Sequence, residues 1–376
     1  MLAMCQPFST TARYHILFDA LMLRSVCLAF PDELIVYMTD RVNCSRMKQY
    51  LGDLPVNLRI LEVGVPDNGA RRLHLHGRLL MNLIACRSMA ERLKVRGLIY
   101  LAFSTITCAL HLVRLSPIAE YYIVHNNFQR ARQIPWEQRL FRWISTRAPY
   151  LIFLEQPIAD AARSEFAVDP SKVIVIPHPI NDAAQIISTA DELGRGIVMA
   201  GRLNKGKGIH FLLDAARLLK KEAPEVLEKA PIKIIGPYYS GHNPKGYIHC
   251  VEYMDQQLTD ADLEQVMRSG QFVIIPYDPQ SYAYVTPGTV YRALGCGRPI
   301  VVTDLPSLYS LTRSPRPVGF AFSDQRQLAS IITHIALMPD GEYEELLDNV
   351  RWLACQRGVA ATADRFRQVF NQYQAL

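Results

Sequence analysis

Short apolar runs rich in branched residues alternate with helix-length segments along the chain, and this alternation constrains the fold more than any other feature. In the first half the runs predict strands at 33–38, 58–63, 98–103, 121–124, 150–154 and 173–176. In the second half they predict strands at 196–200, 232–235, 271–276 and 299–303. Strands separated by helices are typical of a parallel, doubly wound sheet, so we predict the α/β fold class.

The segments between these runs have helical patterns. They predict helices at 12–29, 71–94, 105–115, 135–147 and 157–166, and then at 209–221, 260–269, 287–295 and 325–337. A polar stretch with two prolines, Pro177–Gly196, separates the two series. In a chain of 376 residues, such a break predicts two α/β domains of similar size with a cleft between them.

Composition narrows the class of partner. The net charge of +6 suits anionic small molecules or an anionic membrane surface better than nucleic acid. The eight cysteines are scattered without metal-ligand spacing, which indicates reduced thiols in a cytoplasmic protein. The apolar segment 97–113 is short for a membrane span and is interrupted by hydroxylated residues, so we interpret it as a buried strand followed by a buried helix.

The stretch GRLNKGKGIHFLLDAARLL, from Gly201 to Leu219, places positive charge where a strand gives way to a helix. Ligands bind at the carboxyl ends of strands in open α/β sheets. Arg202 offers a planar fork of donors, Lys207 offers a compact charge, and Gly208 lets an anion approach the backbone. A phosphate or diphosphate fits this loop, although a solvated basic loop would have the same sequence.

A second anion site is predicted after the strand near 273–276. Thr286 and Pro287 form a helix-start signal, with Thr286 at the N-cap and Pro287 as the first helical residue. The free N–H groups of Gly288 and Thr289 would then face an anion at the positive end of this helix. If this helix start meets the basic loop in space, the two can hold a single diphosphate.

These motifs resemble the donor domain of GT-B glycosyltransferases, most closely the family 4 type. Gly-Arg-Leu followed by Lys207-Gly208 has the spacing of that family, and ALGCGRPIVVTD at 293–304 resembles its Ala-x-x-Cys-Gly segment. PHPI at 177–180 resembles its interdomain crossing, and the helical tail 342–374 is of the kind that returns to the first domain. The resemblance implies two Rossmann-like domains facing a cleft, 1–180 for the acceptor and 181–352 for the nucleotide-sugar, with a returning helix at 353–376.

The resemblance also implies that Arg202 and Lys207 bind the donor's diphosphate, while two positions depart from the family. Where the family usually carries two glutamates eight positions apart, this chain has Tyr284 and Arg292. The first position normally contacts the donor sugar, and the second accepts hydrogen bonds from the ribose, which Arg292 cannot do. Arg292 is either an additional charge at the phosphates or a surface arginine on a short helix.

The first domain is expected to hold the acceptor. Ser9 and Thr10 stand where such enzymes have a glycine-rich loop after their first strand, and small hydroxylated side chains can line a cleft. His125 and Asn126 follow the strand at 121–124, where similar enzymes present a histidine to the sugar. His125 is our first candidate for a general base or hydrogen-bond donor, and Glu155 is the second. A strand-end histidine that only caps a loop is the alternative.

No metal or cofactor is expected besides the nucleotide-sugar co-substrate. Asp260 and Asp262 have the spacing of a metal-binding pair, but they lie at a predicted helix start, where carboxylates favour the helix dipole. We therefore interpret them as carboxylates of a helix start.

Two segments suggest peripheral contact with an anionic membrane. FQRARQIPWEQRLFRW at 128–143 carries four arginines and two tryptophans, and RRLHLHGRLLMNLIACR at 71–87 is basic and leucine-rich. Basic amphipathic surfaces with tryptophan suit the membrane interface. A solvated face over an ordinary core is the competing interpretation.

The sequence therefore favours a glycosyltransferase of hexosyltransferase type that uses a nucleotide-diphosphate sugar and an oligosaccharide or lipid-linked acceptor, in cell-surface polysaccharide biosynthesis. A nucleotide-sugar epimerase of the same fold is one alternative. A catalytically degenerate partner that binds sugar nucleotide or glycan is another, and the missing glutamate pair keeps it open.

Overall fold

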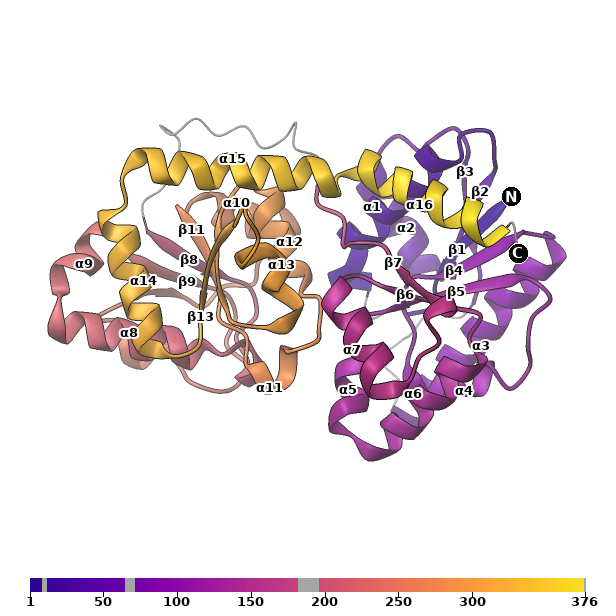
Figure 1. The fold of residues 1–376 in the computed structure, drawn as a ribbon, viewed down its shortest axis with the longest axis horizontal. Coiled ribbons are helices and arrows are strands. Elements are labelled where there is room, and N and C mark those ends of the chain that lie inside the picture. Colours follow the sequence, from indigo (N-terminus) through magenta and orange to yellow (C-terminus); the bar gives the residue numbers. More distant parts are fainter. Residues whose placement is uncertain (9–11, 65–71, 182–195, 375–376) are drawn as a thin grey trace. The chain divides into compact units, whose positions relative to one another are not determined.

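The computed structural model describes residues 1–8, 12–64, 72–181 and 196–374. These residues form two compact units. The first comprises 1–179, 284–286 and 359–376, and the second comprises 180–283 and 287–358. Figure 1 shows that each unit is a sheet covered by helices on its faces.

The first unit contains a parallel sheet of seven strands in the order β3-β2-β1-β4-β5-β6-β7. Its strands are β1 (Leu2–Gln6), β2 (Ile35–Thr39), β3 (Leu58–Glu62), β4 (Gly97–Tyr100), β5 (Ala119–Val124), β6 (Tyr150–Phe153) and β7 (Val173–Val175). Its helices are α1 (Ala12–Ala29), α2 (Arg41–Leu51), α3 (Arg72–Arg92), α4 (Thr105–His111), α5 (Asn127–Gln133), α6 (Pro135–Arg147), α7 (Gln156–Phe166) and α16 (Val359–Gln374). The strands are nearly all buried on both faces, as their apolar runs predict.

Separate apolar clusters lie on the two faces of this sheet. The inner residues of α3, α4, α5, α6 and α7 pack with one set of strand side chains, and those of α1, α2 and α16 pack with the other. The C-terminal helix α16 lies along α1, where Phe366 and Phe370 are buried (Figure 1).

The second unit contains a parallel sheet of six strands in the order β10-β9-β8-β11-β12-β13. Its strands are β8 (Ile197–Ala200), β9 (Ile232–Ile235), β10 (Glu252–Met254), β11 (Phe272–Ile275), β12 (Ile300–Thr303) and β13 (Gly319–Phe322). Its helices are α8 (Ile209–Glu222), α9 (Pro224–Lys229), α10 (Asp260–Arg268), α11 (Pro279–Tyr282), α12 (Gly288–Gly295), α13 (Tyr309–Thr312), α14 (Gln325–Leu337) and α15 (Asp340–Arg357). The predicted α/β class with two doubly wound sheets is confirmed.

Several details differ from the sequence predictions. Helix α2 was not predicted, and neither were strands β10 and β13, which are the two edge strands of the second sheet and are not buried throughout. The tail predicted as one helix is two helices, α15 and α16, separated at Gly358, whose ψ of 175° is extended rather than helical. The helix predicted as buried within 97–113 is buried on one side only, because Leu110 and Val113 are more than half exposed.

A buried ion pair connects the strands and helices of the first unit. The Arg87 guanidinium on α3 donates two hydrogen bonds of 2.7 Å to the Glu120 carboxylate on β5. The hydroxyls of Tyr100 and Tyr122 donate to the same carboxylate at 2.7 and 2.8 Å. All four side chains are buried, so the carboxylate is compensated inside the core by charge and by hydrogen bonds.

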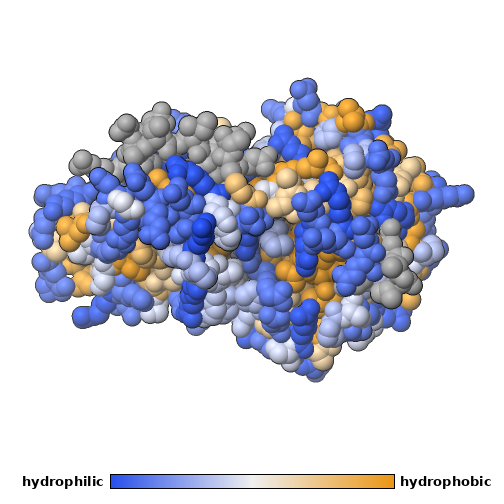
Figure 2. All heavy atoms as spheres, turned by 45° about the horizontal axis from the view of Figure 1, so that its top comes forward, coloured by the Kyte–Doolittle hydropathy of each residue, from blue (hydrophilic) through white to orange (hydrophobic). Residues whose placement is uncertain are grey.

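Two features of the described residues concern contact with a membrane. No helix within the described residues is long and apolar enough to cross a membrane. Figure 2 shows apolar residues on the surface of the first unit, interleaved with hydrophilic ones.

Candidate functional site

The candidate site lies at the carboxyl ends of β8 and β11 in the second unit. These adjacent strands form the point where the strand order reverses, which is where open α/β sheets bind ligands. The loop after β8 meets the loop after β11, because the Asp278 N–H donates to the Gly206 carbonyl at 3.1 Å. Gly208 has a φ of +61°, and a Cβ there would lie 1.7 Å from the Pro276 carbonyl oxygen. Only glycine permits this close approach.

Lys207 and Thr289 meet at this point. The Lys207 ammonium donates to the Tyr277 hydroxyl, and that hydroxyl donates to Thr289 Oγ1 at 2.9 Å. Tyr277 follows β11 and is buried, whereas Thr289 is the second residue of α12. The structure therefore brings together the basic loop and the helix start that the sequence placed in two separate motifs.

Two aromatic rings surround the Lys207 ammonium. Its Nζ lies 3.9 Å from the centroid of Tyr277 and 5.5 Å from that of Tyr282. Burial lowers the pKa of Lys207, and Tyr282 opposes this effect. Burial likewise raises the pKa of Tyr277 to about 12, so its phenol stays neutral. A desolvated cation beside neutral partners provides a favourable position for an anionic group.

Arg202 begins the same loop and is exposed. Its guanidinium carbon lies 5.0 Å from the centroid of Tyr239, whose hydroxyl accepts a hydrogen bond of 2.9 Å from Gln257 Nε2. Tyr239 and Gln257 follow β9 and β10, so three strand ends contribute to the surroundings of Arg202. The aromatic contact restricts where the guanidinium can lie.

The helix start at α12 differs by one residue from the prediction. Pro287 precedes the helix, which begins at Gly288, so Thr286 is not the N-cap. Thr286 is buried, and its Oγ1 has no hydrogen-bond partner among the residues the structure describes. The N–H groups of Gly288 and Thr289 belong to the first turn, whose donors have no intrahelical partner. They remain at the positive end of α12.

Arg292 is not a surface arginine. It is buried on α12, and its Nη1 pairs with Asp260 Oδ1 at 2.5 Å. Asp260 opens α10, where Thr259 and Asp262 form a capping box. The interpretation of Asp260 and Asp262 as residues of a helix start is therefore confirmed, and the Asp260 carboxylate also compensates the Arg292 charge.

Tyr284 packs with the first unit. Its backbone N–H donates to Gln129 Oε1 at 3.0 Å, and its ring is T-shaped against Phe128. The Arg132 guanidinium lies 4.2 Å from the centroid of the same ring. Tyr284 thus has protein partners on its backbone and on its ring.

His125 lies at the carboxyl end of β5 in the first unit. Its Nε2 is 2.7 Å from the Leu101 carbonyl, which can only accept, so Nε2 carries the proton. The rings of His15 and Phe18 pack edge-on against it at 5.2 and 5.1 Å. Burial and the nearby His15 together lower the pKa of His125 to about 3. The expectation of a histidine that titrates near neutral pH does not fit these surroundings.

The other residues predicted in the first unit are placed as follows. Glu155 is buried and directly precedes α7, and Asn126 is exposed and directly precedes α5. Ser9 and Thr10 lie outside the described residues. Asn126, His125 and Glu155 all follow strands of the first sheet.

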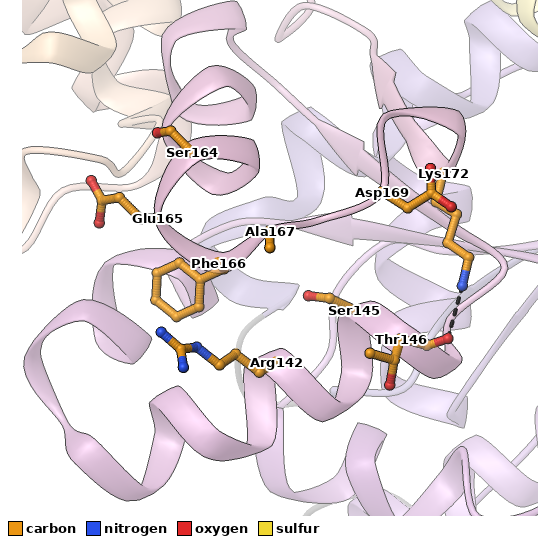
Figure 3. Close-up of a pocket in the computed structure, with 9 residues that line it drawn as sticks. All are labelled: Arg142, Ser145, Thr146, Ser164, Glu165, Phe166, Ala167, Asp169 and Lys172. Carbon is orange, nitrogen blue, oxygen red and sulfur yellow. Dashed lines mark hydrogen bonds between the residues drawn. The ribbon is translucent and has the colours of Figure 1, made fainter.

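A shallow hollow in the first unit lies away from these residues. It has a volume of about 590 Å³ and is lined by α6, the end of α7 and the turn that follows (Figure 3). Lys172 Nζ donates to the Thr146 carbonyl at 2.8 Å across it, and Arg142 and Glu165 line the other part (Figure 3). No residue predicted for the site lines this hollow.

Sequence reasoning missed the tyrosines of the site. Tyr277, Tyr282 and Tyr239 follow strands, and the first two fall within the stretch read as the second anion site. The sequence feature that could have indicated them is the presence of aromatic residues in a loop after a buried strand. Their contact with Lys207 or Arg202 depends on residues 30 to 80 positions apart in the chain, which no local pattern reveals.

The architecture of both units is that of GT-B glycosyltransferases. Residues 194–337 match the model of the family described as glycosyl transferases group 1, which confirms the resemblance drawn from the motifs of the second half. A search of curated proteins gives no matching relative.

Solved structures with the same fold cover nearly the whole chain. Sucrose-phosphate synthase from Thermosynechococcus elongatus has a TM-score of 0.72 at 15% identity, over 100% of this chain and 99% of that one. Anabaena HepE, solved with UDP and glucose, has a TM-score of 0.66 at 14% identity over 100% of both chains. WaaG, a glycosyltransferase involved in lipopolysaccharide biosynthesis, has a TM-score of 0.60 at 12% identity over 98% of this chain and 99% of WaaG.

Proposed function

We propose that this protein transfers a hexose from a nucleotide-diphosphate sugar to an oligosaccharide or lipid-linked acceptor, in the biosynthesis of a cell-surface polysaccharide. The observation that carries the proposal is the meeting of Lys207, Tyr277 and Thr289 at the reversal point of the second sheet. The complexes of HepE with UDP-glucose support the donor class, and the role of WaaG supports the process.

Charge stabilisation at the diphosphate would drive the reaction. Negative charge grows on the leaving diphosphate as the bond to the sugar breaks. Lys207, Arg202 and the first N–H groups of α12 supply positive charge and donors for it. Because the protein supplies these charges, and because Asp260 and Asp262 are engaged at α10, we propose transfer without a metal or a further cofactor.

The first unit would bind the acceptor. His125 is neutral and its Nε2 proton is directed to Leu101, so Nδ1 is left as an acceptor for a sugar hydroxyl. We keep Glu155 as the candidate base, and Asn126, Ser9 and Thr10 as acceptor-side contacts.

We propose a cytoplasmic location with peripheral contact to the inner face of the cell membrane. Lipid-linked acceptors lie at this surface, and its leaflet is anionic. The basic, tryptophan-containing helix α6 supports the contact.

A second candidate is a partner that binds nucleotide-sugar without transferring it. The ion pair between Arg292 and Asp260 favours it, because a buried cation stands where the family places a ribose-binding carboxylate. Tyr284, at the other glutamate position, is engaged by Gln129 and Arg132. Both candidates require the same diphosphate site, and they differ only in turnover.

The test is a thermal-shift panel of UDP-, GDP-, ADP- and dTDP-sugars on the wild type and on Arg202→Ala combined with Lys207→Ala. A ligand at a hundred times its Kd stabilises a protein by about 2.7 kcal/mol, which is readily measured. We expect a shift with one nucleotide base that disappears in the double variant. No shift with any donor in folded protein would refute both candidates. If a donor does bind, its hydrolysis by the wild type but not by an Arg202 variant would favour the transferase over the binding partner.

A further inference from the structure

Helices α3 and α4 expose large apolar side chains. Met81 and Ile84 lie one turn apart on the outer side of α3, and Leu110, Val113 and Leu115 lie on and just after α4. All five are at least half exposed. A single exposed leucine needs no explanation, but a group of large apolar residues on neighbouring helices marks an interaction surface.

Hydrogen bonds hold these elements together with α6. Arg87 of α3 donates to the His111 carbonyl at 3.0 Å and to the Arg114 carbonyl at 2.5 Å, which ties the end of α4 to α3. Arg147 of α6 donates to the Val113 carbonyl at 3.2 Å and lies 5.4 Å from the centroid of Trp143. The inner residues of all three helices pack in one apolar cluster on the same face of the first sheet. Figure 1 shows the three helices on that side.

The same surface carries excess positive charge. Its exposed arginines are Arg92, Arg114, Arg139 and Arg147. The only acidic residues of α3, α6 and the segment 105–118 are Glu91 and Glu137. Glu137 is buried against Arg130, and Glu91 accepts a hydrogen bond from Ser116. Trp136, which is nearly half exposed at the start of α6, adds an amphipathic ring.

We propose that this surface, the α3–α4–α6 face, docks on an anionic lipid bilayer. The apolar side chains would enter the boundary of the acyl chains while the arginines contact lipid headgroups. Charge decides against a second copy of the chain as the occupant, because a two-fold contact would place the arginines of both copies together. The face lies entirely in the first unit, so docking can hold whether or not the second unit binds a nucleotide-sugar.

The segments that can contact a membrane in the structure differ from those predicted from the sequence. Phe128 and Ala131 of α5 are in the core, so the beginning of the 128–143 stretch does not contribute. Leu110, Val113 and Leu115 contribute instead, although their neighbourhood was predicted to be buried.

Co-sedimentation of the full chain with vesicles tests the proposal. The vesicles are phosphatidylcholine alone, or phosphatidylcholine with 30 mol% phosphatidylglycerol (roughly the anionic content of an anionic leaflet), at low and high salt. We expect the wild type to bind the anionic vesicles and to be released in part by salt. Changing Arg92, Arg114 and Arg139 together to Gln should lower partitioning roughly a hundredfold. Leu110→Asn with Val113→Asn should lower it roughly tenfold or more at both salt levels.

Matched variants on the second unit serve as controls. Ile248→Asn with Leu337→Asn removes two exposed apolar side chains, and changing Lys220, Lys221 and Arg326 to Gln removes three exposed charges. Unchanged binding of both control variants to the anionic vesicles would support the α3–α4–α6 face as the docking surface. Equal binding to neutral and anionic vesicles, or controls that lose as much as the test variants, overturns the proposal. A dimer in light scattering that Leu110→Asn with Val113→Asn dissociates would instead assign the face to a second copy and would also overturn it.

Discussion

Lys207 and Thr289 come from loops after different strands, and the hydroxyl of Tyr277 joins them by accepting from the lysine and donating to the threonine. The 82 positions that separate Lys207 from Thr289 in the sequence are bridged by one buried phenol. A diphosphate bound at this point would meet a cation and the first turn of a helix together. Three of the five predictions that follow test this relationship or the residues around it.

Lys207→Met should weaken binding of the nucleotide-sugar identified in the panel by roughly 10- to 100-fold, since hydrogen bonds to charged groups contribute about 1.5–3 kcal/mol. Isothermal titration would measure the change. Lys205→Met is the control, because Lys205 is exposed in the same short turn. If both variants bind equally well, Lys207 does not contact the diphosphate.

Tyr277→Phe should keep the aromatic ring over the Lys207 ammonium while removing both hydrogen bonds. We expect donor affinity to fall by roughly fivefold, because about 1 kcal/mol is typical of a hydrogen bond. Tyr343→Phe removes a similar buried hydrogen bond, from its hydroxyl to the Gln271 carbonyl at 2.9 Å, and should reduce stability without changing donor affinity. A fall in affinity in both variants would point to a general loss of stability.

Gly208→Ala should destabilise the second unit by more than about 1 kcal/mol, because its positive φ disfavours a Cβ and the Pro276 carbonyl occupies the space. Urea denaturation would measure this loss. Gly341→Ala is the control, since a Cβ there meets nothing within 4 Å. We expect its stability to be unchanged or slightly higher, and a similar loss in both variants would contradict the argument from close approach.

His125 should not titrate between pH 5 and 8. Burial and the neighbouring His15 lower its pKa to about 3, so the ring stays neutral throughout this range. The chemical shift of its ring proton, assigned by the loss of the signal in His125→Gln, should stay constant across the range. A midpoint near pH 6.5 would restore His125 as a general base.

Acid stability should depend on Glu120. Burial alone would raise the pKa of this carboxyl, but the neighbouring His111, the hydrogen bonds from Arg87 and Tyr100, and the Arg87 charge lower it from 4.5 to about 2. A lowered pKa in the folded state gives a stabilisation that is present above pH 4.5 and is lost as the pH falls toward 2.

Glu120→Gln should therefore lose about 3 kcal/mol at pH 7 and show a smaller fall in stability between pH 4.5 and 2.5. Urea midpoints across this range would measure it, with the exposed Glu228→Gln as control. Parallel pH profiles for wild type and Glu120→Gln would show that the carboxylate is not compensated as described.

The amino-acid sequence by itself determined the α/β class, most strands and helices, and the position of the basic loop after β8. These properties depend on local patterns: a buried parallel strand needs a continuous apolar run, and α8 needs apolar residues three and four positions apart. The helix-start reading of Asp260 and Asp262 was also local, because a capping box spans four residues.

Only the tertiary structure decided which residues meet. Tyr277 connects two motifs, Asp260 pairs with Arg292, and burial together with His15 lowers the pKa of His125. The exposure of Leu110 and Val113 could not be predicted from the sequence either. An apolar run does not show which side of a helix is covered by a neighbouring element. The physical reason is common to all of these: pairing, burial and pKa depend on atoms that strand order brings together from distant parts of the chain.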